Sequence, residues 1–188
     1  MSKKSLAPET LLYPVPVVMV SCGNRKGDHN IITIAWVGTL CSEPPMVGIS
    51  VRPERYSYDM IKESNEFVVN IPSHDQLKAT DHCGIVSGRD QDKYKSAGLN
   101  KKEALSLKAA PIIEDCPVNI ECIVKNTVPL GSHDLFIGEI TAVQADEEII
   151  TAKGAIDVKK ANPLAYGAGE YWLLDQSVLK HGESKISK

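Results

Sequence analysis

The chain has 188 residues, of which 43% are hydrophobic and 24% charged, which suits one domain with a sizeable core and excludes a disordered chain. Its formal net charge of −3 gives no general attraction to nucleic acid or to an anionic membrane, so we expect neither as a partner. No apolar run reaches the roughly 18 residues of a membrane span, and the first ten residues lack the apolar stretch of a signal peptide.

The five cysteines are odd in number and irregularly spaced. None forms a Cys-x-x-Cys pair, so the sequence shows neither a zinc ribbon nor a thioredoxin motif. We expect reduced, mostly buried thiols in a cytoplasmic protein.

The first part of the chain is predicted to be a loose tail followed by strands. Residues 1–10 form the tail, and the prolines in residues 13–16 favour an extended segment. Residues 17–22 are β-branched and predict a strand, which a polar turn at residues 23–28 ends. Residues 30–40 predict a second strand, apolar enough to be covered on both faces by protein or by a ligand.

Two prolines at residues 44–45 then break the chain, and residues 46–51 return as a strand. A helix over residues 57–63 is expected to begin with Ser57 as its N-cap. Residues 66–71 predict another strand.

The next segment is predicted to be helical. Ser73 is suited to cap a helix over residues 74–82, and a polar loop follows at residues 87–93. Residues 94–98 predict a helical turn that ends at glycine.

Two long strands come next, over residues 118–128 and 133–143, paired back on each other through a turn. A short strand at residues 149–151 and a loose C-terminal segment complete the prediction.

The predicted elements are six or seven strands with two or three short helices between them. Because the strands do not alternate strictly with long helices, a doubly wound parallel sheet is disfavoured. We expect a mainly β, mostly antiparallel Greek-key-like barrel with helices packed at its ends. No linker divides the chain, so we expect one domain over residues 11–175 between tails at 1–10 and 176–188.

The segment at residues 50–57 has the residue types of an anion site. It passes from a strand end to a helix start, where free backbone N–H groups favour an anion. Arg52 and Arg55 are able to add charged hydrogen bonds to phosphate oxygens, and Tyr56 to stack on a ring. The alternative is a solvated turn with ordinary surface arginines.

Residues 30–36 alternate in a way that suits a flat ligand. On a strand, Asn30, Ile32, Ile34 and Trp36 share one face, while Thr33 lies on the other. A few polar atoms among apolar neighbours match a heteroaromatic ring with hydrogen-bonding edges. The alternative is a core strand with capped polar ends.

Other chemistries are poorly supported. Adjacent His82 and Cys83 are not spaced to share a metal ion, and nothing marks a carboxylate partner for a Cys-His pair. The remaining histidines are scattered, and no Gly-x-Gly-x-x-Gly or Walker motif is present.

Taken together, these stretches resemble the flavin reductase-like, flavoredoxin-type proteins of the FMN-binding split β-barrel fold. The resemblance covers roughly residues 12–170, and six stretches keep the family's order and spacing. They are residues 30–36, 41–45, 50–57, 66–72, 83–93 and 133–140.

The resemblance implies a homodimer with FMN bound near the subunit interface, its phosphate near residues 50–57 and its ring against residues 30–41. The positions that match the family's cofactor contacts are Asn30, Thr33, Trp36, Cys41, Ser50, Val51, Arg52, Tyr56 and Ser57, with Ser87, Lys93 and Tyr166 as weaker candidates. Cys41 departs from relatives, which often carry a small hydroxyl or alanine there.

The implied function is oxidoreduction through bound FMN, with electrons supplied by NAD(P)H or by a redox protein. No protein acid or base is required, so no catalytic residue is assigned. The alternative is a non-catalytic FMN-binding electron carrier, or a protein that stores or senses flavin.

Overall fold

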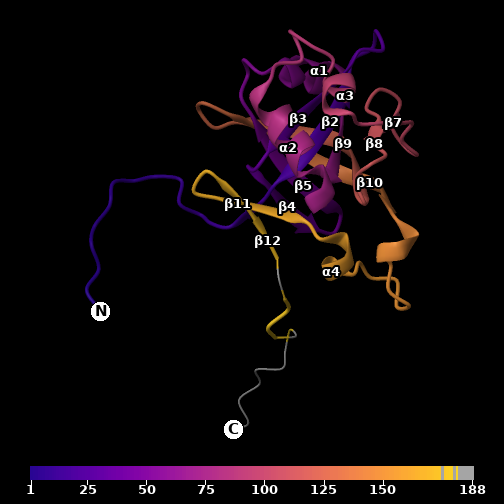
Figure 1. The fold of residues 1–188 in the computed structure, drawn as a ribbon. Coiled ribbons are helices and arrows are strands. Elements are labelled where there is room, and N and C mark those ends of the chain that lie inside the picture. The colour runs from indigo at the N-terminus through magenta and orange to yellow at the C-terminus, as the bar shows by residue number, and fades with distance from the viewer. Residues whose placement is uncertain (175, 180, 182–188) are drawn as a thin grey trace.

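The computed structural model describes residues 1–174, 176–179 and 181. Seven strands form one sheet in the order β3-β2-β6-β9-β10-β5-β4, in which every neighbouring pair is antiparallel. They are β2 (Val18–Gly23), β3 (His29–Ile34), β4 (Val37–Ser42), β5 (Pro45–Val51), β6 (Glu66–Ile71), β9 (Val118–Pro129) and β10 (Asp134–Ala145). Figure 1 shows the C-terminal strands at the lower end of the body.

The sheet curls into an open barrel because its two edge strands, β3 and β4, are consecutive in the sequence. The chain passes from one edge to the other through Ala35 and Trp36. The Ser50 amide of β5 donates a hydrogen bond to the Trp36 carbonyl at 2.9 Å, which holds the bend against β5.

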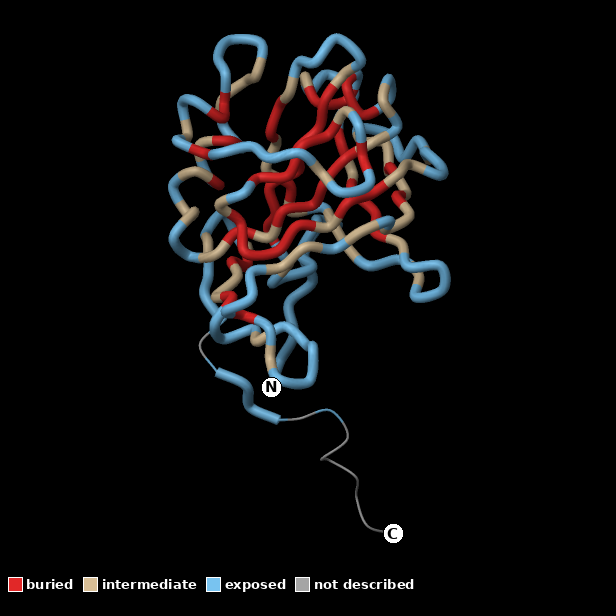
Figure 2. Tube along the Cα trace, turned by 90° about the vertical axis from the view of Figure 1, so that its right-hand side faces the viewer, coloured by how far each residue is buried: buried red, intermediate tan, exposed pale blue. Residues whose placement is uncertain are grey.

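The main core fills the barrel, and Figure 2 shows the buried residues concentrated in the middle of the body. Phe67 and Phe136 are the largest fully buried side chains of this core, and each is at most 1% exposed. Every residue of β2 is buried, since Val20 faces the barrel interior while Met19 faces a second cluster under the helices. Burial on both faces explains why the β2 sequence is almost continuously apolar.

The helices are short, and the first three pack on β2 and β3, whereas the last packs beside a 3-10 turn. They are α1 (Tyr56–Ser64), α2 (Leu77–Ile85), α3 (Lys93–Ala97) and α4 (Val158–Ala161), with 3-10 turns at His74–Gln76 and Glu147–Ile149. Ser73 and Gln76 form a capping box at the 3-10 turn that leads into α2, and Gly98 ends α3 in a left-handed conformation with φ of 66°.

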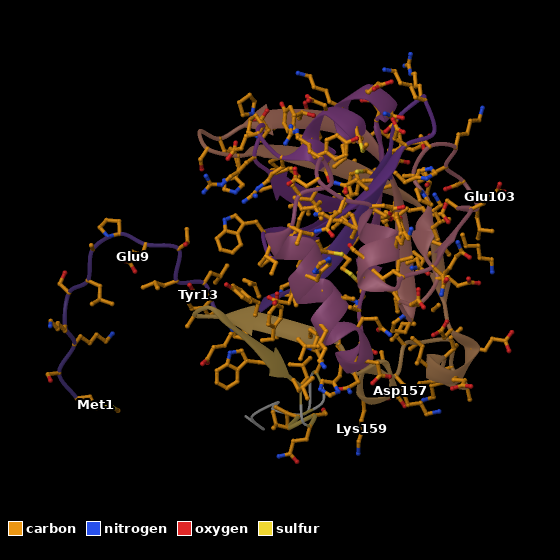
Figure 3. The ribbon with its side chains drawn as sticks, turned by 45° about the horizontal axis from the view of Figure 1, so that its top comes forward. Met1, Glu9, Tyr13, Glu103, Asp157 and Lys159 are labelled. Carbon is orange, nitrogen blue, oxygen red and sulfur yellow. The ribbon has the colours of Figure 1, made fainter. Side chains whose placement is uncertain are left out.

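Two small sheets complete the fold. One has the order β1-β11-β12, with β1 (Val15–Pro16), β11 (Leu164–Gly167) and β12 (Glu170–Leu173), and the other pairs β7 (Lys101–Lys102) with β8 (Ile112–Ile113). Figure 3 shows Met1 and Glu9 on a segment that leads away from the body, up to Tyr13. Within the described residues, no helix is long and apolar enough to cross a membrane.

The antiparallel barrel predicted from the sequence is confirmed, with seven strands in its main sheet. The strands expected at residues 17–22, 46–51, 66–71, 118–128 and 133–143 are present with end shifts of at most two residues. The helix expected at 94–98 is shifted by one residue, and the one expected at 74–82 is a 3-10 turn at His74–Gln76 followed by α2, which ends three residues later than predicted.

Four local predictions are wrong. Residues 30–40 form two strands because the chain must bend at Ala35 and Trp36 to change sheet edges. Ser57 does not cap α1, whose N-cap is Arg55, and the Ser57 side chain is buried instead. The strand expected at residues 149–151 is not formed. Ile149 ends a 3-10 turn instead, and Ile150 makes an isolated bridge with Ile156.

The fourth wrong prediction is the loose C-terminal segment, which contains α4, β11 and β12. These strands pair with β1 and with each other rather than with the main sheet, so local periodicity gave little sign of them. Much of the expected tail at 176–188 lies outside the described residues.

Candidate functional site

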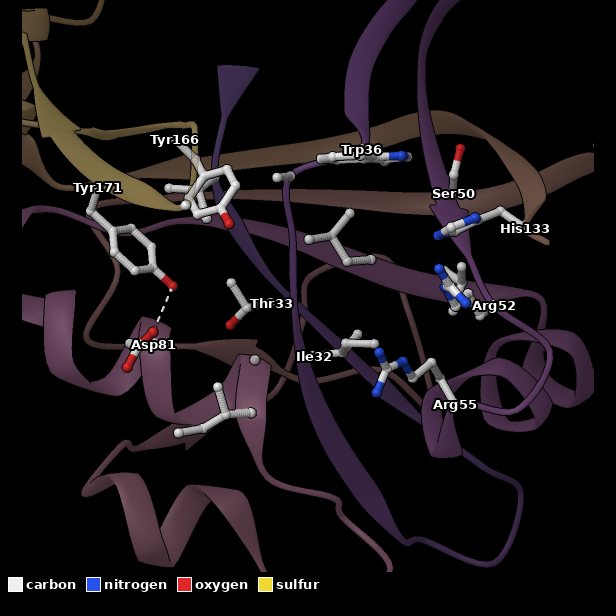
Figure 4. A pocket seen from close by; sticks show the side chains of 17 residues that line it. Ile32, Thr33, Trp36, Ser50, Arg52, Arg55, Asp81, His133, Tyr166 and Tyr171 are labelled. Atoms are coloured by element: carbon white, nitrogen blue, oxygen red, sulfur yellow. Dashed lines mark hydrogen bonds between the residues drawn. The ribbon is translucent and has the colours of Figure 1, made fainter. Parts of the chain in front are cut away.

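A pocket of about 440 Å³ opens where β3 bends toward β4 (Figure 4). Its walls come from β3, from the end of β5, from α2 and from the β11–β12 hairpin. The lining residues are Val17, Ile32, Thr33, Ile34, Ala35, Trp36, Ser50, Val51, Arg52, Arg55, Asp81, Gly84, Ile85, His133, Tyr166, Gly169 and Tyr171.

One side of this pocket is aromatic. Tyr166 and Tyr171 pack edge to face with ring centroids 5.5 Å apart, and the Tyr171 hydroxyl donates to the Asp81 carboxylate of α2 at 3.1 Å. Burial and this hydrogen bond raise the pKa of Tyr171 to about 12, so its phenol stays protonated at neutral pH. Trp36 lies across the pocket from α2 and is 39% exposed.

The opposite side is cationic. Figure 4 shows Arg52, Arg55 and His133 grouped beside Ser50 at this end. Arg52 contacts Glu54 at 3.6 Å, and both side chains are largely in solvent. Burial and the two arginines lower the pKa of His133, so its ring is neutral at pH 7.

Thr33 contributes an oriented hydroxyl between the two sides. It donates to the Thr80 carbonyl of α2, so the lone pairs of its oxygen remain free to accept a hydrogen bond. A Cβ at Gly84 would lie 3.3 Å from Thr33, so the small residue allows α2 to approach β3 closely.

A second, smaller pocket of about 120 Å³ adjoins the first through their shared lining residues Ile32, Arg55, Gly84 and Ile85. Its floor is polar and buried. The Asn30 amide donates to the Ser57 hydroxyl oxygen at 2.8 Å, and the two residues are 3% and 0% exposed. Because Ser57 accepts from Asn30, its own O–H remains available to donate to a ligand.

Lys93 places a buried cation at this smaller pocket. The residue is 4% exposed, and its Nζ donates to the Cys83 carbonyl at 2.8 Å. Among the described residues, no carboxylate lies within ion-pair distance of Lys93. Burial, with Arg55 nearby, lowers the pKa of Lys93, which is the cost of an ammonium group without a counter-ion.

The N-terminus of α1 faces the same pocket, since Arg55, Tyr56 and Ser57 line it. In the part of the chain that the structure describes, no side chain caps this helix end. The first amides of a helix carry partial positive charge and have no partner within the helix. The uncapped helix end, Lys93 and the Ser57 hydroxyl therefore make the smaller pocket suitable for a compact anion.

The structure brings eleven of the twelve predicted site residues to these two pockets. Thr33, Trp36, Ser50, Val51, Arg52 and Tyr166 line the larger pocket, and Asn30, Tyr56, Ser57, Ser87 and Lys93 line the smaller one. Cys41 is not brought there. It lies on edge strand β4, and its thiol contacts the Glu43 carbonyl at 3.3 Å.

Several lining residues were not expected from the sequence. Tyr171 and Asp81 meet only because the C-terminal hairpin folds over α2, and His133 reaches the site at the start of β10. The His82 ring contacts Ser96 at 2.9 Å, while burial raises the pKa of Cys83 to about 11. The described residues hold no group of three or more His, Cys, Asp or Glu side chains placed to bind a metal ion.

The similarity of this chain to known proteins is extensive. Residues 10–172 match the family described as flavin reductase like domain. The flavoredoxin of Desulfovibrio vulgaris (Miyazaki F) is 33% identical, with a TM-score of 0.91 over 97% of this chain and 99% of that one. The flavoredoxin from Methanosarcina acetivorans is 32% identical, with a TM-score of 0.89 over 98% of this chain and 97% of that one.

Two relatives without the flavoredoxin name are also similar. An uncharacterized protein of Archaeoglobus fulgidus is 33% identical over 156 residues, which are 83% of this chain and 86% of that protein. The high molecular weight rubredoxin of Moorella thermoacetica is 28% identical over 137 residues, which are 72% of this chain and 57% of that protein.

Proposed function

The chain belongs to the flavin reductase-like family, and on this premise we propose that it is an FMN-binding oxidoreductase of flavin reductase or flavoredoxin type. One observation carries the proposal. A wide pocket with apolar and aromatic walls adjoins a small polar pocket that holds the buried ammonium group of Lys93. This division matches FMN, whose flat ring system and terminal phosphate need different surroundings.

The ring system suits the larger pocket. Ile32 and Trp36 offer apolar surface along the β3 edge, and the Thr33 oxygen is free to accept a hydrogen bond from a ring N–H. Tyr166 and Tyr171 close the far side as an aromatic wall. These groups would orient the ring and exclude water from one of its faces.

The phosphate suits the smaller pocket. Lys93 supplies charge, Ser57 an O–H donor, and the start of α1 its free amides. This assignment keeps the phosphate beside residues 50–57, as the sequence predicted, but it favours Arg55, Tyr56 and Ser57 over Arg52. Arg52 lines the larger pocket with His133 instead.

When bound, FMN supplies hydride and single-electron transfer. The chain's own residues bind and orient it, and the cations of both pockets favour added negative charge. We assign no protein group as acid or base.

We propose NAD(P)H or a redox protein as the electron donor. The similarity to a rubredoxin of high molecular weight supports a redox-protein partner, since that protein is a relative over most of this chain. The rival function is an FMN-binding carrier, store or sensor without turnover.

We also propose that the chain forms a homodimer and works in a reducing compartment such as the cytoplasm. An apolar groove of about 450 Å³ adjoins the site, shares Trp36 with it, and includes Leu12 and Leu40, which are 83% and 48% exposed. Exposed apolar surface of this kind is typical of an interface. All five cysteines are free, which fits reducing conditions.

Spectroscopy of the purified protein tests these proposals. After incubation with FMN and gel filtration, the protein should keep a flavin spectrum, and a colourless protein would refute FMN binding. Anaerobic titration with NADH, NADPH and a reduced rubredoxin then separates the functions. Oxidation of a nicotinamide indicates a reductase, reduction by rubredoxin alone indicates a carrier, and no reaction indicates storage or sensing. Light scattering on the same sample gives the oligomeric state.

A further inference from the structure

Arg89 bridges the two sides of the smaller pocket. Its guanidinium donates to the Glu54 carbonyl at 3.0 Å and lies 5.5 Å from the centroid of the Tyr56 ring. Glu54 lies just before α1 and Tyr56 is the first residue of α1, whereas Arg89 belongs to the loop between α2 and α3. Both segments line the pocket, so the Arg89 side chain spans the space between its opposite rims.

The loop that carries Arg89 is held in place. A Cβ added at Gly88 would collide with the Asn30 amide oxygen and lie 2.8 Å from the Tyr56 ring, so the backbone is packed directly on the pocket floor. A turn fixes the loop, since the Arg89 amide donates to the Ser87 hydroxyl at 3.2 Å and the Asp90 amide to the Ser87 carbonyl at 3.1 Å. The pocket therefore does not widen by a simple shift of this loop.

We infer that Arg89 makes the site selective for the mononucleotide FMN over the dinucleotide FAD, an inference that rests on the proposed flavin function. A terminal phosphate ends within the 120 Å³ pocket. In FAD the same phosphate continues through a second phosphate to adenosine, which must leave the pocket. The inference places that exit at the rim that Arg89 spans, so FAD must break the Arg89 contacts with Glu54 and Tyr56.

The expected selectivity follows from the two contacts that FAD must displace. Loss of a charged hydrogen bond and of an exposed cation–π contact implies FAD binding weaker than FMN binding by about 30-fold or more. Removal of the side chain beyond Cβ should abolish this penalty. FMN ends inside the pocket and leaves the Arg89 contacts in place, so its affinity should not rise in the variant but should fall, because one positive charge leaves the rim of the phosphate pocket. The FAD affinity should rise, so the two changes have opposite signs.

The test is a fluorescence titration of the full chain with FMN and with FAD. The variants are Arg89→Ala and, as a control, Arg25→Ala, which removes an exposed arginine from the turn after β2. Circular dichroism confirms that each is folded. We expect Arg89→Ala to bring the FAD affinity close to the FMN affinity, and Arg25→Ala to keep the wild-type ratio.

The outcomes separate this inference from the function on which it rests. Equal affinity of the wild type for both flavins, or an unchanged ratio in Arg89→Ala, would overturn the role of Arg89 while leaving flavin binding intact. Failure of the wild type to bind either flavin would overturn the proposed function and this inference together. A ratio that changes equally in Arg25→Ala would show a general charge effect and would also overturn it.

Discussion

Replacement of Lys93 by Met should weaken FMN binding without weakening the fold. Lys93 is 4% exposed, its Nζ donates to one carbonyl, and the methionine side chain is of similar length and apolar. The substitution removes a buried charge that lacks a carboxylate partner, and replacement of buried charges by apolar groups is often neutral or stabilising. We therefore expect an unfolding temperature equal to or above that of the wild type.

The expected loss of affinity follows from the interaction that disappears. A hydrogen bond from an ammonium group to a phosphate oxygen contributes about 1.5–3 kcal/mol, which is about a 10- to 150-fold change in Kd. The opposite directions of the two effects distinguish a ligand-binding role from a structural one.

The assay is quenching of FMN fluorescence, with Lys95→Met as the matched control because Lys95 is an exposed lysine on the same helix α3. Since burial and Arg55 lower the pKa of Lys93, its ammonium group loses its proton at a pH below the ordinary lysine pKa of 10.5. FMN affinity in the wild type should therefore weaken as the pH rises toward that value, by more than in Lys93→Met. Wild-type affinity in Lys93→Met, or an equal loss in Lys95→Met, would refute the assignment of the phosphate to this pocket.

Two further predictions concern stability. Glu121→Gln should lower the free energy of unfolding at pH 7 by about 2 kcal/mol in a denaturant titration, because the buried carboxylate accepts from Leu105 and Ser106 amides at 2.8 and 2.7 Å. Burial raises the pKa of Glu121, but these hydrogen bonds have the larger effect and hold the pKa below 4.5. The stability that the carboxylate contributes should therefore be present above pH 4.5 and be lost as the pH falls through the lowered pKa. An acid transition that is the same in the variant as in the wild type would contradict this. Gly138→Ala should cost about 1–3 kcal/mol by thermal unfolding, since the added Cβ would lie 2.5 Å from the Phe67 ring, and an unaffected melting temperature would show that the core yields there.

The polar residues of the site show why the sequence indicated which side chains suit an anion but not how they are arranged in space. Arg52 and Arg55 are three residues apart and were expected to hold one phosphate together. In the structure Arg52 lines the larger pocket and contacts Glu54, while Arg55 lies where the two pockets meet. Lys93 was a weaker candidate in the sequence because nothing in an exposed-looking polar loop indicates that its ammonium group is buried.

The sequence by itself determined most strands of the main sheet and the class of fold, because β-branched runs, paired prolines and capping residues act over a few neighbouring positions. Only the tertiary structure decided the bend at Trp36, the place of Tyr171 beside Asp81, the burial of Lys93 and the separation of Cys41 from the site. Each of these depends on contacts between segments far apart in the chain. Side-chain periodicity carries no record of such contacts, since it reports only which face of an element is apolar.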